Sequence, residues 1–248
     1  MGSLQKNYMT LTTSLLENKV SVPREFNRIA SSYDFATQLS RGYQEDLDTS
    51  AIRMNLKGDE KLLDLCCGTG KSTLACLKQL QSGTIVGVDN SEGMLLEADK
   101  KFTTQISSGK VVFVLSDAMQ LNFPDNSFDV VFIAYGLRNM PDYEKALKGI
   151  NRILKPGGKI CIHDYCINDN IWAKAYWAIL GYGFIVPFCT VLSGSSRIYT
   201  YLVKSVLTFL NPGQVKNLLE QTGFKNVEVN PLTGWRKPIL HTFVAVKA

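Results

Sequence analysis

Residues 62–73 read LLDLCCGTGKST, and they give the clearest indication of the fold. An apolar run is followed by a glycine-containing turn and then by residues that can begin a helix. A loop of this kind belongs to one of three nucleotide-binding designs: a phosphate-binding P-loop, a dinucleotide fold, or a third nucleotide fold without the phosphate-binding glycines.

The first two designs fail on spacing. A P-loop ending at Gly70, Lys71 and Ser72 requires a glycine at position 65, which is occupied by Leu65. The dinucleotide pattern requires a third glycine where Thr73 stands.

Asp64, just before the loop, favours the third design. A carboxylate fixed beneath the loop repels a pyrophosphate and attracts a cation. S-adenosylmethionine (SAM) carries an ammonium and a sulfonium and no phosphate, so the pattern D-x-x-x-G-x-G suits it. Asp89 ends the next apolar run and Asp117 the third, at positions suited to the ribose hydroxyls and the adenine amino group. Each acid alone is more typical of a helix N-cap, but three acids at successive strand ends favour a nucleoside site.

Short apolar runs alternate with helical patterns, which predicts a repeated strand–helix arrangement. The fold class is therefore α/β and Rossmann-like: a mostly parallel seven-stranded sheet with helices on both faces. Two final strands with no helix between them predict an antiparallel hairpin at the C-terminus. The five strands expected before this hairpin are residues 61–65, 84–89, 111–117, 128–135 and 159–165.

Composition excludes several classes. The net charge of +5 comes from scattered Lys and Arg, so nothing demands a nucleic-acid partner. The six cysteines form no CxxC pair and there are two histidines, so we expect reduced thiols in an intracellular protein and no metal site. Residues 1–22 lack a secretory signal and are expected to be an extension, while residues 23–248 form a single domain. We expect a cytoplasmic location, with peripheral membrane contact, a mitochondrial or plastid location and a homodimer left open.

Several motifs together resemble a known group. LLDLCCGTG, VDNSEGMLL (88–96), DNSFDVV (125–131) and RILKPGGK (152–159) are similar to motifs of class I SAM-dependent methyltransferases. FNRIASSYD (26–34) and FPDNSFDVVFIAYGLRNMPDYEKAL (123–147) resemble, within that group, the ubiquinone and menaquinone biosynthesis C-methyltransferases of the UbiE/MenG type.

The resemblance implies a cofactor site for SAM and a helical segment, 26–34, closing over it. The residues that it places on the cofactor are Tyr33, Asp64, Gly68, Thr69, Gly70, Asp89, Asn90, Met94, Asp117, Ala118, Ala134 and Tyr135.

A carbon nucleophile on an aromatic ring attacks well when a ring hydroxyl loses its proton, so a base or a bound water is expected at the carboxyl edge. His163 is the first candidate base, and packing between helix and sheet is an equal alternative. Asp164 either orients a water or caps the next helix. Arg138 either holds a quinol oxygen or pairs with a carboxylate. Tyr199 resembles a tyrosine over the family's acceptor pocket, and helix packing explains it nearly as well.

Residues 171–191, IWAKAYWAILGYGFIVPFCTV, are apolar enough to suggest a membrane span. Gly181, Gly183 and Pro187 interrupt the run, which lies within the domain. An insertion at about 166–210 that forms an apolar lid over the acceptor is therefore favoured over a span. The purely structural alternative is a helix pair that covers the core.

These observations predict a SAM-dependent methyltransferase, most consistent with C-methylation of a lipophilic, prenylated quinol. One alternative is O-, N- or C-methylation of another hydrophobic small molecule. Another is a SAM-binding scaffold subunit without catalysis.

Overall fold

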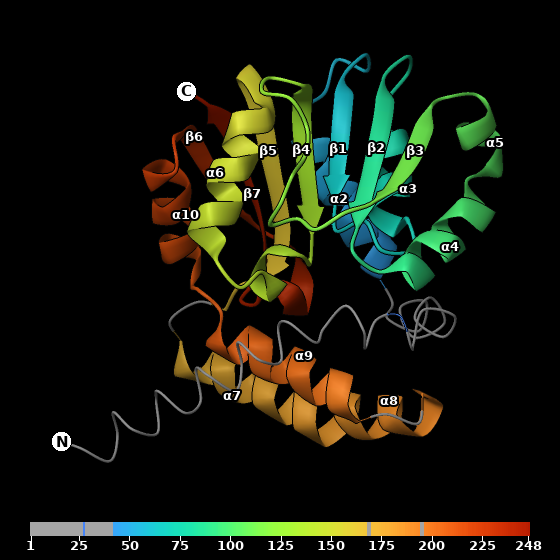
Figure 1. The fold of residues 1–248 in the computed structure, drawn as a ribbon. Coiled ribbons are helices and arrows are strands. Elements are labelled where there is room, and N and C mark those ends of the chain that lie inside the picture. The colour runs from blue at the N-terminus through green and yellow to red at the C-terminus, as the bar shows by residue number, and fades with distance from the viewer. Residues whose placement is uncertain (1–26, 28–41, 168–169, 194–195) are drawn as a thin grey trace.

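The computed structural model of the chain describes residue 27 and residues 42–167, 170–193 and 196–248. Its centre is a seven-stranded sheet in the order β3-β2-β1-β4-β5-β7-β6 (Figure 1). The strands are β1 (Lys61–Leu65), β2 (Thr84–Asp89), β3 (Val111–Leu115), β4 (Phe128–Ala134), β5 (Leu154–Tyr165), β6 (Phe224–Pro231) and β7 (Leu240–Lys247).

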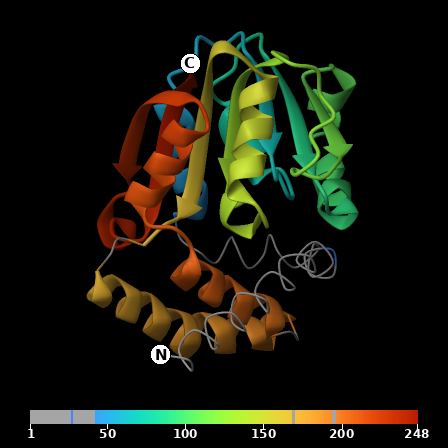
Figure 2. The same ribbon diagram turned by 60° about the vertical axis from the view of Figure 1, so that its left-hand side comes forward.

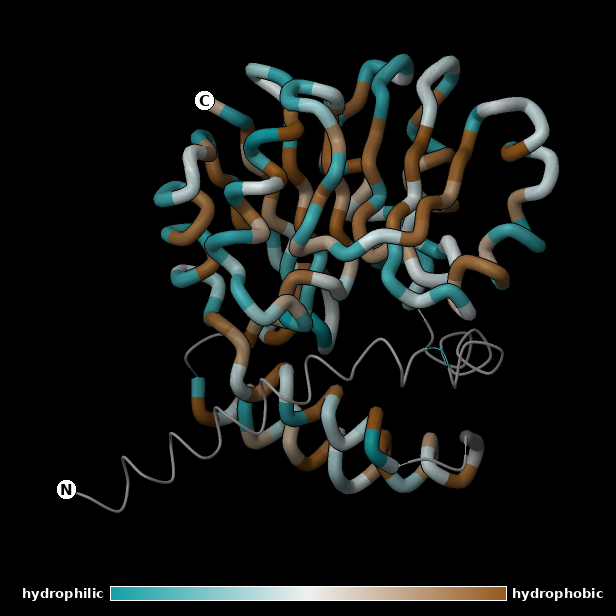
Figure 3. Tube along the Cα trace, viewed as in Figure 1, coloured by the Kyte–Doolittle hydropathy of each residue, from teal (hydrophilic) through white to brown (hydrophobic). Residues whose placement is uncertain are grey.

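The pairing matches the expected topology. The first five strands pair in parallel, and β7 lies antiparallel between β5 and β6. The parallel strands read as nearly continuous apolar runs because both of their faces are covered, and Figure 3 shows this apolar centre. All the parallel strands end at one edge of the sheet, which Figure 1 places at the bottom.

Two apolar layers cover the sheet. One packs α2 and α3 on the face that carries Leu62 and Phe132, and the other packs α6 and α10 on the face that carries Leu63 and Ile133. Figure 2 shows α10 beside the closing strands β6 and β7. The helices of this main body are α2 (Tyr43–Arg53), α3 (Lys71–Leu77), α4 (Glu92–Lys101), α5 (Thr103–Ser107), η1 (Leu137–Asn139), α6 (Tyr143–Ile153), α10 (Pro212–Gln221) and η3 (Gly234–Arg236).

A separate helical layer lies beyond the carboxyl edge of the parallel strands (Figures 1 and 2). We call it the α7–α9 layer, formed by α7 (Ile171–Leu180), η2 (Gly181–Ile185), α8 (Val186–Ser193) and α9 (Arg197–Thr208). η2 is a π-helical turn, so Gly181 and Gly183 leave the helical rod intact and only widen it.

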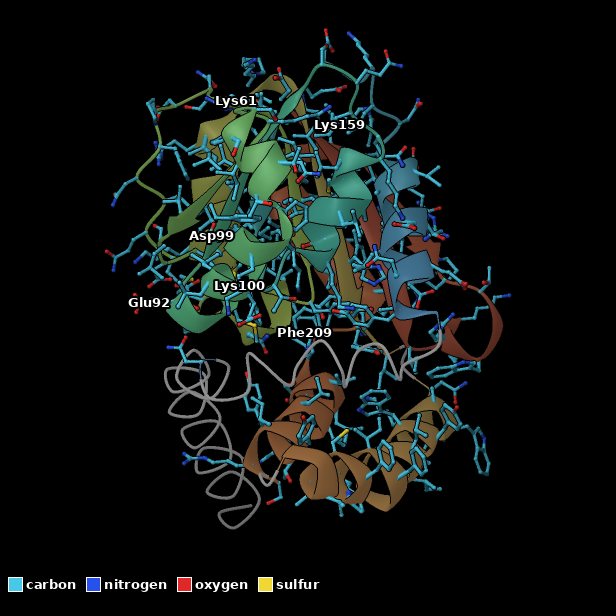
Figure 4. The ribbon with its side chains drawn as sticks, turned by 90° about the vertical axis from the view of Figure 1, so that its right-hand side faces the viewer. Lys61, Glu92, Asp99, Lys100, Lys159 and Phe209 are labelled. Carbon is cyan, nitrogen blue, oxygen red and sulfur yellow. The ribbon has the colours of Figure 1, made fainter. Side chains whose placement is uncertain are left out.

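Phe209, which follows α9, joins this layer to the main body (Figure 4). Its ring meets Tyr143 of α6 at 5.4 Å between centroids. Figure 4 also shows Lys61 and Lys159 at the opposite end of the sheet, and Glu92, Asp99 and Lys100 on the outer side of α4.

Candidate active site at the carboxyl edge

A pocket of about 360 Å³ opens at the carboxyl ends of β1, β2 and β4. This is the edge at which open α/β sheets bind ligands. Its wall comprises Tyr43, Leu47, Cys66, Cys67, Gly68, Thr69, Lys71, Ser72, Asp89, Asn90, Met94, Asp117, Ala118, Met119, Ala134, Tyr135, Gly136, Arg138, Asn139, Met140 and Pro141. Nine of the residues that the resemblance implied lie on this wall: Gly68, Thr69, Asp89, Asn90, Met94, Asp117, Ala118, Ala134 and Tyr135.

The glycine loop leaves room for a ligand. Gly68 has φ +53°, and a Cβ built on it would meet nothing within 4 Å, so its backbone borders open space. Gly70 supports the loop from behind. It has φ +86°, and an added Cβ would come within 2.4 Å of the Phe102 ring, so this position requires glycine.

Asp89 has the geometry of a ribose acceptor. One carboxylate oxygen accepts a hydrogen bond from Gly68 N at 2.9 Å and the other from Ser91 N at 2.9 Å. Each oxygen keeps acceptor capacity for a hydroxyl. Burial raises the pKa of Asp89, and the hydrogen bonds from Gly68 and Ser91 oppose that rise.

Asp64 lies beneath the loop and does not line the pocket. Its side chain is fully buried and accepts hydrogen bonds from Ser72 Oγ at 2.8 Å and Thr73 Oγ1 at 2.6 Å. Its other oxygen, Oδ1, has no hydrogen-bond partner in the described structure. Burial raises the Asp64 pKa to about 7, against the two hydroxyl donors. Contact between Asp64 and a cation therefore stays a prediction; the structure places the carboxylate beneath the glycine loop.

His163 is also set back from the pocket. It is fully buried, with Nδ1 2.7 Å from Ser50 Oγ and Nε2 2.9 Å from the Tyr135 hydroxyl. Burial lowers its pKa to about 3, and the charges of Arg53, Arg138 and Arg236 add to that effect. The His163 ring, the candidate base, is linked to the pocket wall through the Tyr135 hydroxyl.

Arg138 and Asp164 form a buried ion pair of 2.5 Å. Asp164 also accepts hydrogen bonds from the backbone N of Arg138 and of Tyr165. The expected helix cap or water-orienting role of Asp164 is thus replaced by a role in holding Arg138 and η1. Arg138 lines the pocket, and burial and the Asp164 charge act on its pKa in opposite directions, with a net rise.

Tyr199 does not line the pocket. It is buried on α9 in a cluster with Ile198 and Tyr201, which is consistent with the helix-packing alternative. Tyr201, which sequence reasoning did not single out, reaches the site from α9, where its hydroxyl donates to Asn139 Oδ1 at 3.1 Å.

Tyr33 lies outside the described residues. Within the segment 26–34, Asn27 is described, and its Oδ1 accepts hydrogen bonds from Ser91 Oγ at 2.6 Å and Gly93 N at 3.0 Å. This contact ties Asn27 to the start of α4, next to Asp89.

Sequence reasoning also missed Tyr43, Cys66, Lys71 and Asn139 on the wall. Asn139 directly follows Arg138 in the AYGLRN motif, which offered a signal. Tyr43 had none, because α2 reaches the pocket only through the fold.

The comparisons with known proteins decide the family. Residues 12–244 match the ubiE/COQ5 methyltransferase family. The chain belongs to this family. A demethylmenaquinone methyltransferase of Staphylococcus aureus (strain JH9) is 37% identical over 222 residues, covering 88% of this chain and 90% of that protein.

Solved structures agree on the fold. A SAM-dependent methyltransferase from Thermotoga maritima has a TM-score of 0.63 at 20% identity, covering 90% of this chain and 98% of that one. Phosphoethanolamine N-methyltransferase 2 of Haemonchus contortus, solved with S-adenosylhomocysteine, has a TM-score of 0.59 at 20% identity, with 80% and 52% covered. The predicted fold class, enzyme class and SAM cofactor are confirmed.

Proposed function

We propose that this methyltransferase transfers the methyl group of SAM to a ring carbon of a prenylated quinol. The observation that carries the proposal is the 37% identity to a demethylmenaquinone methyltransferase along nearly the full length of both chains. The pocket at the carboxyl edge and the apolar layer beside it supply compatible chemistry.

The residues present fit SAM. Asp89 offers its carboxylate to the ribose, and Asp117 and Ala118 lie where the adenine is expected. The open space at Gly68 accommodates a group lying against the backbone. SAM supplies an activated methyl group through its sulfonium, so the protein has mainly to align the acceptor and exclude water.

Arg138 is the residue best placed to favour the reactive acceptor. A quinol carbon becomes nucleophilic as a ring hydroxyl ionises, and a guanidinium stabilises the resulting oxyanion. Asp164 fixes Arg138 through the ion pair and through Arg138 N. The acceptor is therefore the reduced quinol, because the oxidised quinone has no ring hydroxyl to ionise.

The acceptor assay tests this proposal. Purified protein with SAM should methylate a reduced demethylnaphthoquinol with an isoprenoid tail, and should do so less efficiently when the tail is removed. The same compound in its oxidised form is the control and should gain no methyl group. Turnover of the oxidised quinone, or of an amine and no quinol, would contradict the proposal.

We further infer that the α7–α9 layer docks on a membrane surface from which the tailed acceptor is drawn. Ile171–Val191 is one helical run long and apolar enough to cross a bilayer by length and composition. Its outward side chains are strongly exposed: Ile171, Trp172, Ile179, Phe184 and Val191 range from 61% to 85%.

The charges of this layer complement an anionic surface. Residues 171–208 contain Lys174, Arg197 and Lys204 and no acidic residue. Exposed Trp and Tyr beside Lys and Arg are typical of segments that lie in the membrane interface. Several exposed apolar side chains with basic neighbours favour this docked arrangement.

A further inference from the structure

A chain of hydrogen bonds runs through the domain to the pocket wall. Arg53 Nη1 donates to Thr242 Oγ1 at 2.8 Å, and Thr242 Oγ1 lies 2.7 Å from Ser50 Oγ. Ser50 Oγ lies 2.7 Å from His163 Nδ1, and His163 Nε2 lies 2.9 Å from the Tyr135 hydroxyl. The side chains of Ser50, His163 and Thr242 are completely buried.

Three elements bring these groups together. His163 on β5 and Thr242 on β7 face each other in the antiparallel register. Ser50 on α2 packs over both and completes the link. A buried polar group without a partner is destabilising, so each member of the hydrogen-bond chain depends on its neighbours.

This chain of hydrogen bonds can orient hydrogen atoms, but it has no acceptor at its outer end, which is Arg53. Arg53 only donates, so a proton arriving at Thr242 could not pass to it. Nor is His163 suited to hold a proton as imidazolium, because it is buried and Arg53, Arg138 and Arg236 add positive charge. These facts favour a positioning role for His163.

Tyr135, at the inner end of the hydrogen-bond chain, contacts both the pocket and the apolar cluster beside it. Among the described residues, Tyr135 alone both lines the pocket and packs against the buried cluster of Trp177, Val203 and Leu240. Its ring stacks on Tyr43 at 5.1 Å and meets Tyr165 at 5.3 Å.

The backbone of Tyr135 is held in a costly conformation. Its φ is +57°, in the left-handed region that bulky side chains rarely adopt. Tyr135 N donates to His163 O at 2.7 Å, so β5 fixes both its backbone and its hydroxyl. Strain of this kind persists when the surrounding structure enforces it.

We propose that Ser50, His163 and Thr242 are positioning residues that fix the Tyr135 ring, and that this ring aligns the acceptor with the methyl donor. The proposal rests on the proposed methyl transfer and extends it to residues behind the pocket. Tyr135 would form the wall shared by the cofactor pocket and the route from the α7–α9 layer.

A double-mutant cycle between Tyr135→Phe and His163→Leu tests the coupling. Each single variant should lower kcat about tenfold, because small misplacements of reacting groups slow transfer strongly. The dissociation constant for SAM should change by no more than about threefold. The double variant should be about as slow as the slower single variant, since both remove one interaction.

Two further variants separate positioning from folding. His163→Gln retains an amide that can bond to Tyr135 and should recover part of the kcat lost in His163→Leu. Thr242→Val removes the hydroxyl with almost no change of shape and should lower kcat in the same direction. His241→Gln is the matched control, because His241 is also a buried histidine but lies on β7. This variant should keep kcat within about twofold of the wild type.

The positioning role would be overturned if the effects of Tyr135→Phe and His163→Leu on kcat multiplied in the double variant, or if Tyr135→Phe left kcat unchanged. In either case, turnover of the quinol by the wild type would still support the proposed function. A readout independent of turnover is the nitrogen-15 spectrum of His163. The hydrogen-bond chain predicts that the Nε2 resonance of His163 shifts in Tyr135→Phe, because Nε2 loses the tyrosine hydroxyl; an unchanged Nε2 resonance would also overturn the proposal.

Discussion

Asp64 is a fully buried acid that lies directly beneath the glycine loop of the pocket. With its pKa raised to about 7, a large share of the carboxyl groups is protonated near neutral pH in the free protein. A sulfonium and an ammonium bound above it favour the ionised form.

SAM binding should therefore release protons near pH 7. Calorimetry in buffers of different ionisation enthalpy should report a fractional proton release, and Asp64→Asn should reduce it. The amide retains an oxygen that can accept from Ser72 and Thr73. Equal proton release in the variant would show that Asp64 is not the source.

Gly70 offers a second test at the residue scale. Gly70→Ala should cost more stability than Gly109→Ala, although both glycines have positive φ. Gly109 has nothing within 4 Å of an added Cβ, so that variant isolates the backbone cost, about 1–2 kcal/mol. Gly70→Ala adds a clash with Phe102 and should cost about 1–3 kcal/mol more. Urea unfolding measures both, and equal losses would contradict the clash.

At the scale of elements, η1 depends on the ion pair between Arg138 and Asp164. Truncating one partner of a buried pair leaves the other charge uncompensated, at a cost of about 3–5 kcal/mol. Asp164→Asn should therefore destabilise the protein and lower kcat. The matched variant Lys148→Gln breaks an exposed ion pair with Glu144, which solvent screens, and should leave the unfolding midpoint nearly unchanged. Similar unfolding midpoints for the two variants would contradict this account.

The α7–α9 layer makes a prediction about membranes. Replacing Trp172, Ile179 and Phe184 together by Ser should lower the fraction of protein that sediments with anionic vesicles. Turnover of a tail-less quinol should stay nearly unchanged. Leu96→Ser, at an exposed leucine on α4 away from the layer, is the control and should bind vesicles as the wild type does. Unaltered sedimentation of the triple variant would exclude this face as the docking surface.

Sequence patterns predicted the strands and their parallel or antiparallel pairing well, and the helices of the α7–α9 layer less well. The parallel strands and the closing hairpin follow from local runs of apolar residues, which depend on period and on turn residues alone. The α7–α9 layer was expected as an insertion, but its two glycines and Pro187 were read as breaks in the helix. The structure accommodates the glycines in the π-helical turn η2.

The residues of the site were also predicted unevenly. Residues in strand-to-helix loops, such as Gly68 and Asp89, were predicted because their roles depend on local sequence. The surroundings of His163 were not predicted, because Ser50 on α2 and Thr242 on β7 lie 113 and 79 positions away from it along the chain. The pairing of Arg138 with Asp164 was one of the two roles expected for this arginine, and the sequence could not show that the two groups are buried together.

For the whole molecule, the two buried histidines govern part of the acid response. The pKa of His163 is lowered to about 3 and that of His241 is also lowered, mainly by burial. The unfolded chain binds their protons near pH 6.5, so their contribution to stability is present above pH 6.5 and is lost as the pH falls toward 3. The raised pKa of Asp64 acts in the opposite direction, and that contribution is lost as the pH rises toward 7.

His163→Gln should therefore unfold with a weaker dependence on pH below 6.5 than the wild type. Urea unfolding at pH 7.5, 5.5 and 4.5 measures this, and the difference between the two proteins should narrow as the pH falls. A constant difference across the three values would show that His163 is protonated in the folded state.

Locating the methyl group in the product shows whether the protein transfers it from SAM to a quinol carbon. The protein is incubated with SAM carrying a carbon-13 methyl group and a reduced, prenylated demethylnaphthoquinol, and the product is analysed by NMR. We predict a labelled methyl group bonded to the ring carbon. A label on a ring oxygen, or no labelled quinone while another acceptor is methylated, would contradict the account.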